Sequence, residues 1–128
     1  MRNLESYIAI DNVCAWPKLT PMPDGSIAAV IFNQPTHGRW QGDVECWGSR
    51  DDGRTWEPRS VIQRGDTNET ALLNVDGNRL LAAVRTSQAR DVELFESDDA
   101  GGTWSEQGRS RRKINTPPTC CRWQTGAS

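Results

Sequence analysis

An eight-residue pattern that occurs twice constrains this chain more than any other feature. The pattern is Ser-x-Asp-x-Gly-x-Thr-Trp, and its two copies begin at Ser49 and Ser97, which are 48 positions apart. The match extends upstream, because an Asp-Val-Glu tripeptide precedes each copy in the same register, at 43–45 and 91–93. A period of about 40 to 50 residues with strand-like flanks is typical of β-propeller repeats.

The residue types of this octapeptide are those of a tight turn. Asp and Ser side chains bond nearby backbone N–H groups, Gly accepts a positive φ, and Thr and Trp resume a strand. A calcium loop is the alternative, and it is less well supported because neither copy supplies the terminal bidentate Glu of an EF-hand loop. The residues assigned to the turns are Ser49, Asp51, Gly53, Thr55, Trp56, Ser97, Asp99, Gly101, Thr103 and Trp104.

A second repeat lies between the octapeptides. Residues 19–30 and 72–84 each contain an apolar run, an Asp-Gly pair and a second apolar run, which is a strong hairpin signal. Each unit is therefore predicted to contain four antiparallel strands. The expected strands are 15–22, 26–33, 43–49 and 56–62 in the first unit, and 70–75, 79–86, 91–97 and 104–109 in the second.

These repeats divide the chain into four parts. Residues 1–13 are expected to be the outer strand of another blade, with a short strand at 6–10, or an N-terminal arm. Residues 14–62 and 63–112 are the two blades, and residues 113–128 form an aberrant tail. A further apolar strand is due about 48 residues after Leu72 and is missing. A shifted reading frame after about Arg112 would restore that strand with its Asp-Gly turn, and the coding DNA tests this hypothesis.

Composition excludes several classes of function. The chain has 128 residues and a net charge of −2, so it lacks the basic excess that nucleic-acid binding requires. No apolar run is long enough to span a membrane, and the N-terminus lacks the apolar core of a signal peptide. No metal or cofactor is expected, since the chain has one His and no C-x-x-C motif. Cys46, inside a strand, is expected to pack as a small apolar residue; a disulfide with Cys14 is the alternative.

The loops opposite the octapeptide turns are expected to carry function, because binding residues concentrate on loops held by rigid strands. The loop at 33–43 is the longest and contains His37, Arg39 and Trp40, which could contact a sugar by hydrogen bonding, charge and stacking. Arg85 comes from the corresponding loop of the second unit. A solvated loop is the alternative for all four. Three residues of the next connection are expected to be turn residues: Asp66, Asn68 and Glu69.

The octapeptide, its period and its four-strand units resemble the Asp-box, or BNR, repeats of the sialidase superfamily over residues 6–110. The resemblance implies an all-β fold with about two blades of a six-bladed β-propeller. It also implies a partial glycoside hydrolase whose longer parent removes terminal sialic acid or a related acidic sugar from glycans. Fold alone does not fix function, and the fragment is expected to be inactive by itself. The resemblance is compatible with a secreted or periplasmic parent, but the residues indicate no compartment.

Carried over residue by residue, the resemblance is partial. Asp43 is the candidate acid/base, although its repeat partner Asp91 favours a strand-start role. Ala15 stands where the family has an arginine that binds the substrate carboxylate, and Ala cannot make that contact. Two alternatives stay open. One is a non-catalytic Asp-box propeller that binds glycan or protein, and the other is a self-associating blade pair in which three copies complete a ring.

Overall fold

The chain folds into two antiparallel β-sheets of four strands each. The computed structural model describes residues 5–36, 41–86, 88 and 91–110, and within them every regular element is a strand. The first sheet has the order β1-β2-β3-β4 and the second the order β5-β6-β7-β8. The strands are β1 (Cys14–Pro21), β2 (Ile27–Phe32), β3 (Val44–Ser49), β4 (Glu57–Gln63), β5 (Thr67–Asp76), β6 (Arg79–Thr86), β7 (Val92–Ser97) and β8 (Ser105–Ser110).

This architecture confirms the predicted all-β fold of two four-stranded antiparallel blades, and two local expectations were wrong. The short strand expected at 6–10 does not form, and residues 5–13 run as an irregular arm. β5 begins at Thr67 rather than at 70, because Gly65 and Asp66, with φ of 62° and 48°, complete the chain reversal. Asn68 and Glu69 therefore lie in a strand and not in a turn. No helix in the described part of the chain is long and apolar enough to cross a membrane.

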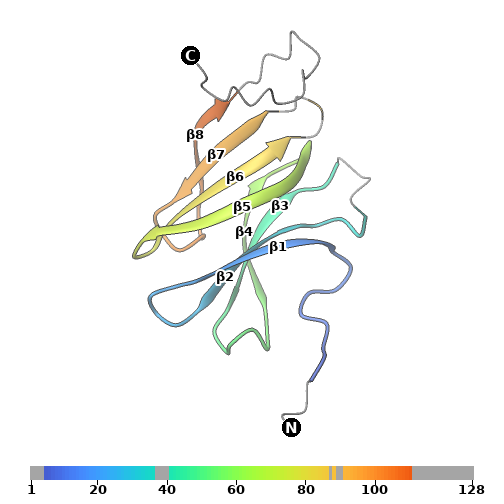
Figure 1. Ribbon diagram of the computed structural model, residues 1–128, viewed down its shortest axis with the longest axis vertical. Helices are drawn as coiled ribbons and strands as arrows, with labels where there is room; N and C mark the ends of the chain where they lie inside the picture. The colour runs from blue at the N-terminus through green and yellow to red at the C-terminus, as the bar shows by residue number, and fades with distance from the viewer. Residues whose placement is uncertain (1–4, 37–40, 87, 89–90, 111–128) are drawn as a thin grey trace, which may run out of the picture.

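The two sheets stack face to face, with β1 beside β5 (Figure 1). The stacked surfaces, called here the inner faces, share one apolar core. The first sheet contributes Val30, Val44, Cys46 and Ile62, and the second contributes Ala82, Val84 and Phe95. Alternation along β6 explains this burial, because every second residue of a strand faces the same side. The opposite surfaces are called the outer faces.

Each octapeptide forms the turn between the third and fourth strands of its sheet. In the first turn, Asp51 Oδ1 accepts the Thr55 N–H at 2.8 Å and Asp51 Oδ2 accepts the Thr55 hydroxyl at 2.6 Å. Ser49 Oγ donates to Asp51 Oδ1 at 2.9 Å and accepts the Gly53 N–H at 2.8 Å. These bonds close the loop on itself, which is why the sequence repeats these residue types.

The second octapeptide repeats the same bonds. Thr103 donates its N–H and its hydroxyl to the two oxygens of Asp99, at 2.8 and 2.7 Å. The glycine is required at both sites, because Gly53 and Gly101 have φ of 82° and 88°. The two turns are thus nearly superimposable in their internal hydrogen bonding.

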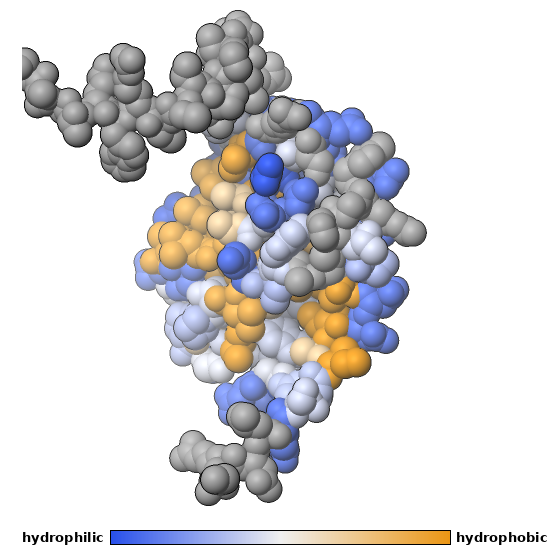
Figure 2. Space-filling model, turned by 45° about the vertical axis from the view of Figure 1, so that its right-hand side comes forward, coloured by the Kyte–Doolittle hydropathy of each residue, from blue (hydrophilic) through white to orange (hydrophobic). Residues whose placement is uncertain are grey.

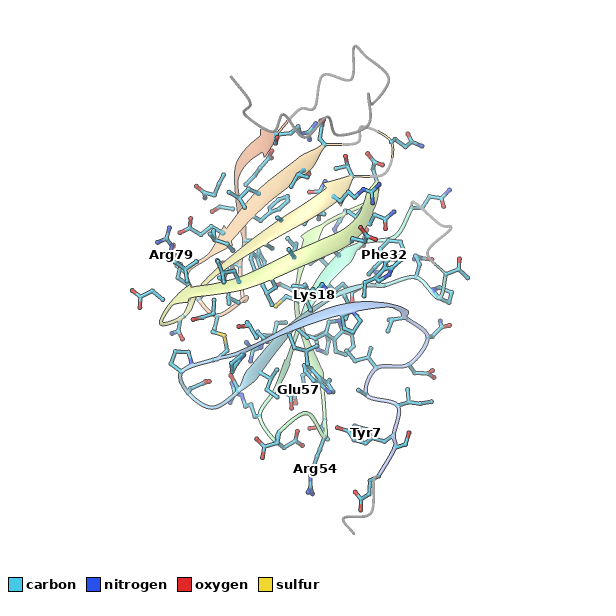
Figure 3. All side chains as sticks on the ribbon, viewed as in Figure 1. Tyr7, Lys18, Phe32, Arg54, Glu57 and Arg79 are labelled. Carbon is cyan, nitrogen blue, oxygen red and sulfur yellow. The ribbon has the colours of Figure 1, made fainter. Side chains whose placement is uncertain are left out.

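The two turns differ in what lies against them. The second turn packs on β4 of the first sheet, where Arg59 Nη1 donates to the Ala100 carbonyl at 2.7 Å and the Ser60 hydroxyl donates to the Gly101 carbonyl. Among the described residues no sheet precedes the first turn, and the Tyr7 hydroxyl of the arm donates to the Gly53 carbonyl instead. Figure 3 shows Tyr7 reaching from the arm toward this turn. Tyr7 therefore occupies the position that Ser60 occupies one blade further on.

Candidate functional site

One end of the two sheets gathers the residues from which a site can be built. Because the strands are antiparallel and in sequence order, the β2–β3, β4–β5 and β6–β7 connections share the end opposite the octapeptide turns. The predicted sugar-contact residues His37, Arg39 and Trp40 belong to the β2–β3 connection but lie outside the described residues. Asp43 and Arg85, the other two candidates, are described.

Asp43 is held by the neighbouring β4–β5 connection. Its Oδ1 accepts the Gly65 N–H at 2.9 Å, and its Oδ2 lies 3.3 Å from Arg64 Nη1. Its N–H donates to Asn33 Oδ1 at 2.8 Å, and its carbonyl accepts the Asn33 N–H at 3.0 Å. Both carboxylate oxygens thus have partners, and Asp43 ties two loops together at the base of the longest connection.

Asp91 closes the equivalent connection of the second sheet in the same way. Its N–H donates to Thr86 Oγ1 at 3.0 Å, and its carbonyl accepts the Thr86 N–H at 3.0 Å. Its carboxylate has a different partner, since it lies 3.8 Å from Arg109 Nη1 on β8. The repeated aspartate therefore closes a loop in both blades, while its carboxylate is free to take a local partner.

A groove lies beside this end, along the first strands of the two sheets. It encloses about 380 Å³. Its lining comes from β1, β5, β6 and the start of β7: Trp16, Lys18, Glu69, Thr70, Ala71, Ala83, Arg85 and Val92. Figure 3 shows Lys18 on β1 next to β5. The groove thus combines one indole, two cations and one carboxylate with an apolar floor.

Trp16 stands out in this groove by its backbone conformation. Its φ of 77° is rare for a large L-residue, and the β1–β2 register breaks between Cys14 and Lys18. Pro17 follows and cannot donate to the ladder, which is compatible with a break in pairing at this point. Strained backbone of this kind clusters at ligand-binding positions and is held there by surrounding structure.

Arg85 and Glu69 form the ion pair of the groove. Arg85 Nη1 lies 3.1 Å from Glu69 Oε2, and the two side chains are 59% and 52% exposed. A pair this exposed stabilises the fold by roughly 0 to 1 kcal/mol. An incoming anion can therefore replace Glu69 at Arg85 with little cost in stability.

The sequence alone singled out Arg85 but missed Trp16, Lys18 and Glu69. Glu69 was assigned to a turn, and Trp16 and Lys18 were read only as part of a strand. Their place in the repeat could have identified them, because each lies near the start of the first strand of its unit. The first strands of neighbouring blades contact each other.

Comparison with known proteins identifies the fold. No family model and no curated protein matches the sequence. Among solved structures, a Penicillium chrysogenum α-L-arabinanase matches with a TM-score of 0.62 and 21% identity, covering 79% of this chain and 33% of that protein. A Hadza microbial sialidase matches with a TM-score of 0.56 and 22% identity, covering 73% of this chain and 18% of that protein.

A third solved structure agrees with these two. The GH93 α-L-arabinofuranosidase of Fusarium graminearum matches with a TM-score of 0.54 and 17% identity over 79% of this chain and 33% of that protein. The chain thus spans a third or less of the proteins it resembles. It has the fold of consecutive blades of a β-propeller, and these structural neighbours are glycoside hydrolases.

Proposed function

We propose that this chain is part of a propeller glycoside hydrolase that acts on terminal sialic acid or a related acidic sugar. The observation that carries the proposal is the groove of Trp16, Lys18, Glu69 and Arg85. An indole offers a face for a sugar ring, and two cations attract a carboxylate. The likeness to glycosidase blades supports the class of substrate.

In this proposal the groove binds and does not cleave by itself. The acidic group of the sugar takes the place of Glu69 at Arg85, and Lys18 adds a second positive charge from β1. Asp43 stays the predicted acid/base of the longer parent. In that role it would keep Arg64 and the Gly65 N–H as neighbours, because each oxygen accepts one bond here and has a second lone pair for the substrate proton.

A non-catalytic glycan-binding propeller is the second candidate. Two observations favour it: Ala15 stands where the family has its carboxylate-binding arginine, and Asp43 is tied into a loop-closing network. A fluorogenic sialoside assay on the longer parent separates the two candidates. Turnover that disappears in Asp43→Asn supports the hydrolase, and glycan binding without turnover supports the binding module.

The binding step itself is testable on this chain by NMR titration with N-acetylneuraminic acid. Arg85→Ala is expected to weaken binding at least about tenfold, which corresponds to about 1.4 kcal/mol. Arg79→Ala is the matched control, because Arg79 also lies on β6, pairs with Glu96 at 2.6 Å and sits at the other end of the strand. Glu69→Gln is expected to strengthen binding by freeing Arg85.

Two outcomes would count against the acidic-sugar assignment. One is equal weakening by Arg79→Ala and Arg85→Ala, which would indicate a general charge effect. The other is binding of neutral arabinobiose at the same residues, with N-acetylneuraminic acid excluded. That result would favour an arabinan-type substrate.

A further inference from the structure

The exposed apolar side chains of this protein fall into two separate groups. Tyr7, Ile8 and Leu19 lie on the arm and on the outer side of β1. The second group lies on β5 and β7: Leu73, Val75, Val92 and Leu94. Figure 2 shows hydrophobic patches on both the upper and the lower half of the molecule. Patches of this kind mark interaction surfaces on a folded protein.

The second group belongs to the outer face of the second sheet. Leu73 pairs with Leu81 across β5 and β6, and Leu94 pairs with Ala83 across β6 and β7, so these side chains share one side. By the repeat, Val92 and Leu94 correspond to Val44 and Cys46 of the first sheet. Val44 and Cys46 are 0% exposed because the second sheet covers them, whereas Val92 and Leu94 are 43% and 38% exposed.

The first group surrounds the complementary surface on the first sheet. A hollow of about 510 Å³ lies between the arm and this sheet, lined by Ile8, Ile10, Leu19, Ile31 and Trp56 among others. This is the face that corresponds to the inner face of the second sheet, because Glu45 and Trp47 here occupy the repeat positions of Glu93 and Phe95. The chain therefore carries both halves of one sheet-to-sheet interface on opposite sides: the half on the second sheet is exposed, and the arm borders the half on the first sheet.

We propose that these two outer faces bind each other between copies of this chain, head to tail. The contact repeats the stacking already present between the two sheets, with the second sheet of one copy placed against the first sheet of the next. Such a contact is heterologous, so each copy keeps one free face until a ring closes. This inference does not rest on the proposed function, but the two share a surface, because Ala83, Arg85 and Val92 of the outer face also line the groove. Association is therefore expected to compete with sugar binding, and the two are measured separately, by sedimentation and by NMR titration.

Tyr7 of the arm makes a hydrogen bond in the first sheet that β8, unlike β4, cannot offer to a neighbouring blade. Within the chain, the Ser60 hydroxyl of β4 donates to the Gly101 carbonyl of the next blade. By register, Gly108 of β8 stands at the position of Ser60 and has no donor to offer. The Gly53 carbonyl of the receiving copy already accepts the Tyr7 hydroxyl, and a Cβ at Gly108 would meet nothing within 4 Å. Tyr7 thus satisfies the carbonyl that β8 cannot reach.

Sedimentation analysis of the chain across a concentration series tests the proposal. The wild type is expected to shift from 14.3 kDa toward multiples of that mass as concentration rises. Leu94→Asp places a charge on the outer face of the second sheet, and Leu19→Asp places one on the outer face of the first. Each variant is expected to stay at the monomer mass. Arg64→Gln, in the β4–β5 connection where the side chain is 77% exposed, changes the net charge by the same one unit and should associate as the wild type does.

Mixing the two variants gives the decisive measurement. Each retains the face that the other has lost, so an equimolar mixture is expected to form a one-to-one dimer and nothing larger. A wild type that stays monomeric at every concentration would overturn the proposal, as would a mixture that stays monomeric while the wild type associates. Circular dichroism on each variant separates loss of association from loss of the fold.

Discussion

The two octapeptide turns have the same internal chemistry but different neighbours. In both, an aspartate binds the N–H and hydroxyl of a threonine, and a glycine with positive φ follows. The second turn packs against Arg59 and Ser60 of the first sheet, whereas the first turn, within the described part of the chain, is contacted by the arm through Tyr7. The repeated residues thus determine the hydrogen bonds inside each turn. How much each turn contributes to the free energy of unfolding depends on the residues that pack against it.

The largest expected difference between the turns is at the glycine. A Cβ at Gly101 would lie 2.5 Å from Cys46 Sγ, whereas at Gly53 the nearest atom lies 3.6 Å away. Gly101→Ala should therefore add an overpacking cost of about 1–3 kcal/mol to the backbone cost of about 1–2 kcal/mol that both substitutions share. Urea unfolding measures both. Equal losses in Gly53→Ala and Gly101→Ala would show that packing between the sheets does not distinguish the turns.

A smaller difference is expected at the hydroxyls that contact the two glycine carbonyls. Ser60→Ala removes the donor to the Gly101 carbonyl and the acceptor of the Trp104 indole N–H, which lies 3.0 Å from Ser60 Oγ. Unfolding free energy should fall by about 2 kcal/mol, because the carbonyl of the buried Gly101 and the half-buried indole of Trp104 lose their partners. Tyr7→Phe should cost only about 0.5 kcal/mol, since Tyr7 is 57% exposed and water can replace it. A cost for Tyr7→Phe as large as that for Ser60→Ala would contradict this ranking.

The smallest difference, close to zero, is expected in how much each turn contributes to the pH dependence of stability. The Thr55 hydroxyl and N–H lower the pKa of Asp51 to about 2, and the Thr103 N–H and hydroxyl do the same for Asp99. Because the folded pKa lies below the ordinary value of 3.8, each aspartate stabilises the fold above pH 4, and this contribution is lost as pH falls toward 2.

Asp51→Asn and Asp99→Asn should flatten the curve of stability against pH between 4 and 2 to the same degree. Thermal unfolding at several pH values in that range measures the slope. Asp52→Asn removes a charge from the first turn without touching the threonine bonds, so it serves as the control. A steeper slope for one copy than for the other would show that its neighbours, and not only the threonine, hold its carboxylate.

Most of the fold was predictable because the repeat determines it locally. The Asp-Gly pairs and octapeptides fix where strands reverse, and alternation fixes which residues face the core, so strand order and number follow. Cys46 was expected to pack as a small apolar residue, and it is 0% exposed in the core. For residues 1–13 the sequence left an outer strand and an N-terminal arm open, and the strand expected at 6–10 was wrong, since its strand-like composition finds no partner strand among the described residues.

The groove was only partly predictable for a different reason. Trp16 and Glu69 are about 50 residues apart in sequence and come together only because β1 and β5 are the adjacent strands of two stacked sheets. A single repeat unit gives no information on this contact. Arg85 was found because the period alone locates the loop-bearing end, although it was expected in the loop and lies on β6, one residue before that strand ends.

Cys46 gives the molecule a built-in reporter of sheet separation. Its thiol lies between the sheets beneath Gly101, and burial raises its pKa to about 11, so it stays protonated and shielded at neutral pH. With the other three cysteines replaced by serine, an alkylating reagent would modify this sulfur only when one blade lifts from the other. The labelling rate would then count those openings directly, one blade junction at a time, without unfolding the chain.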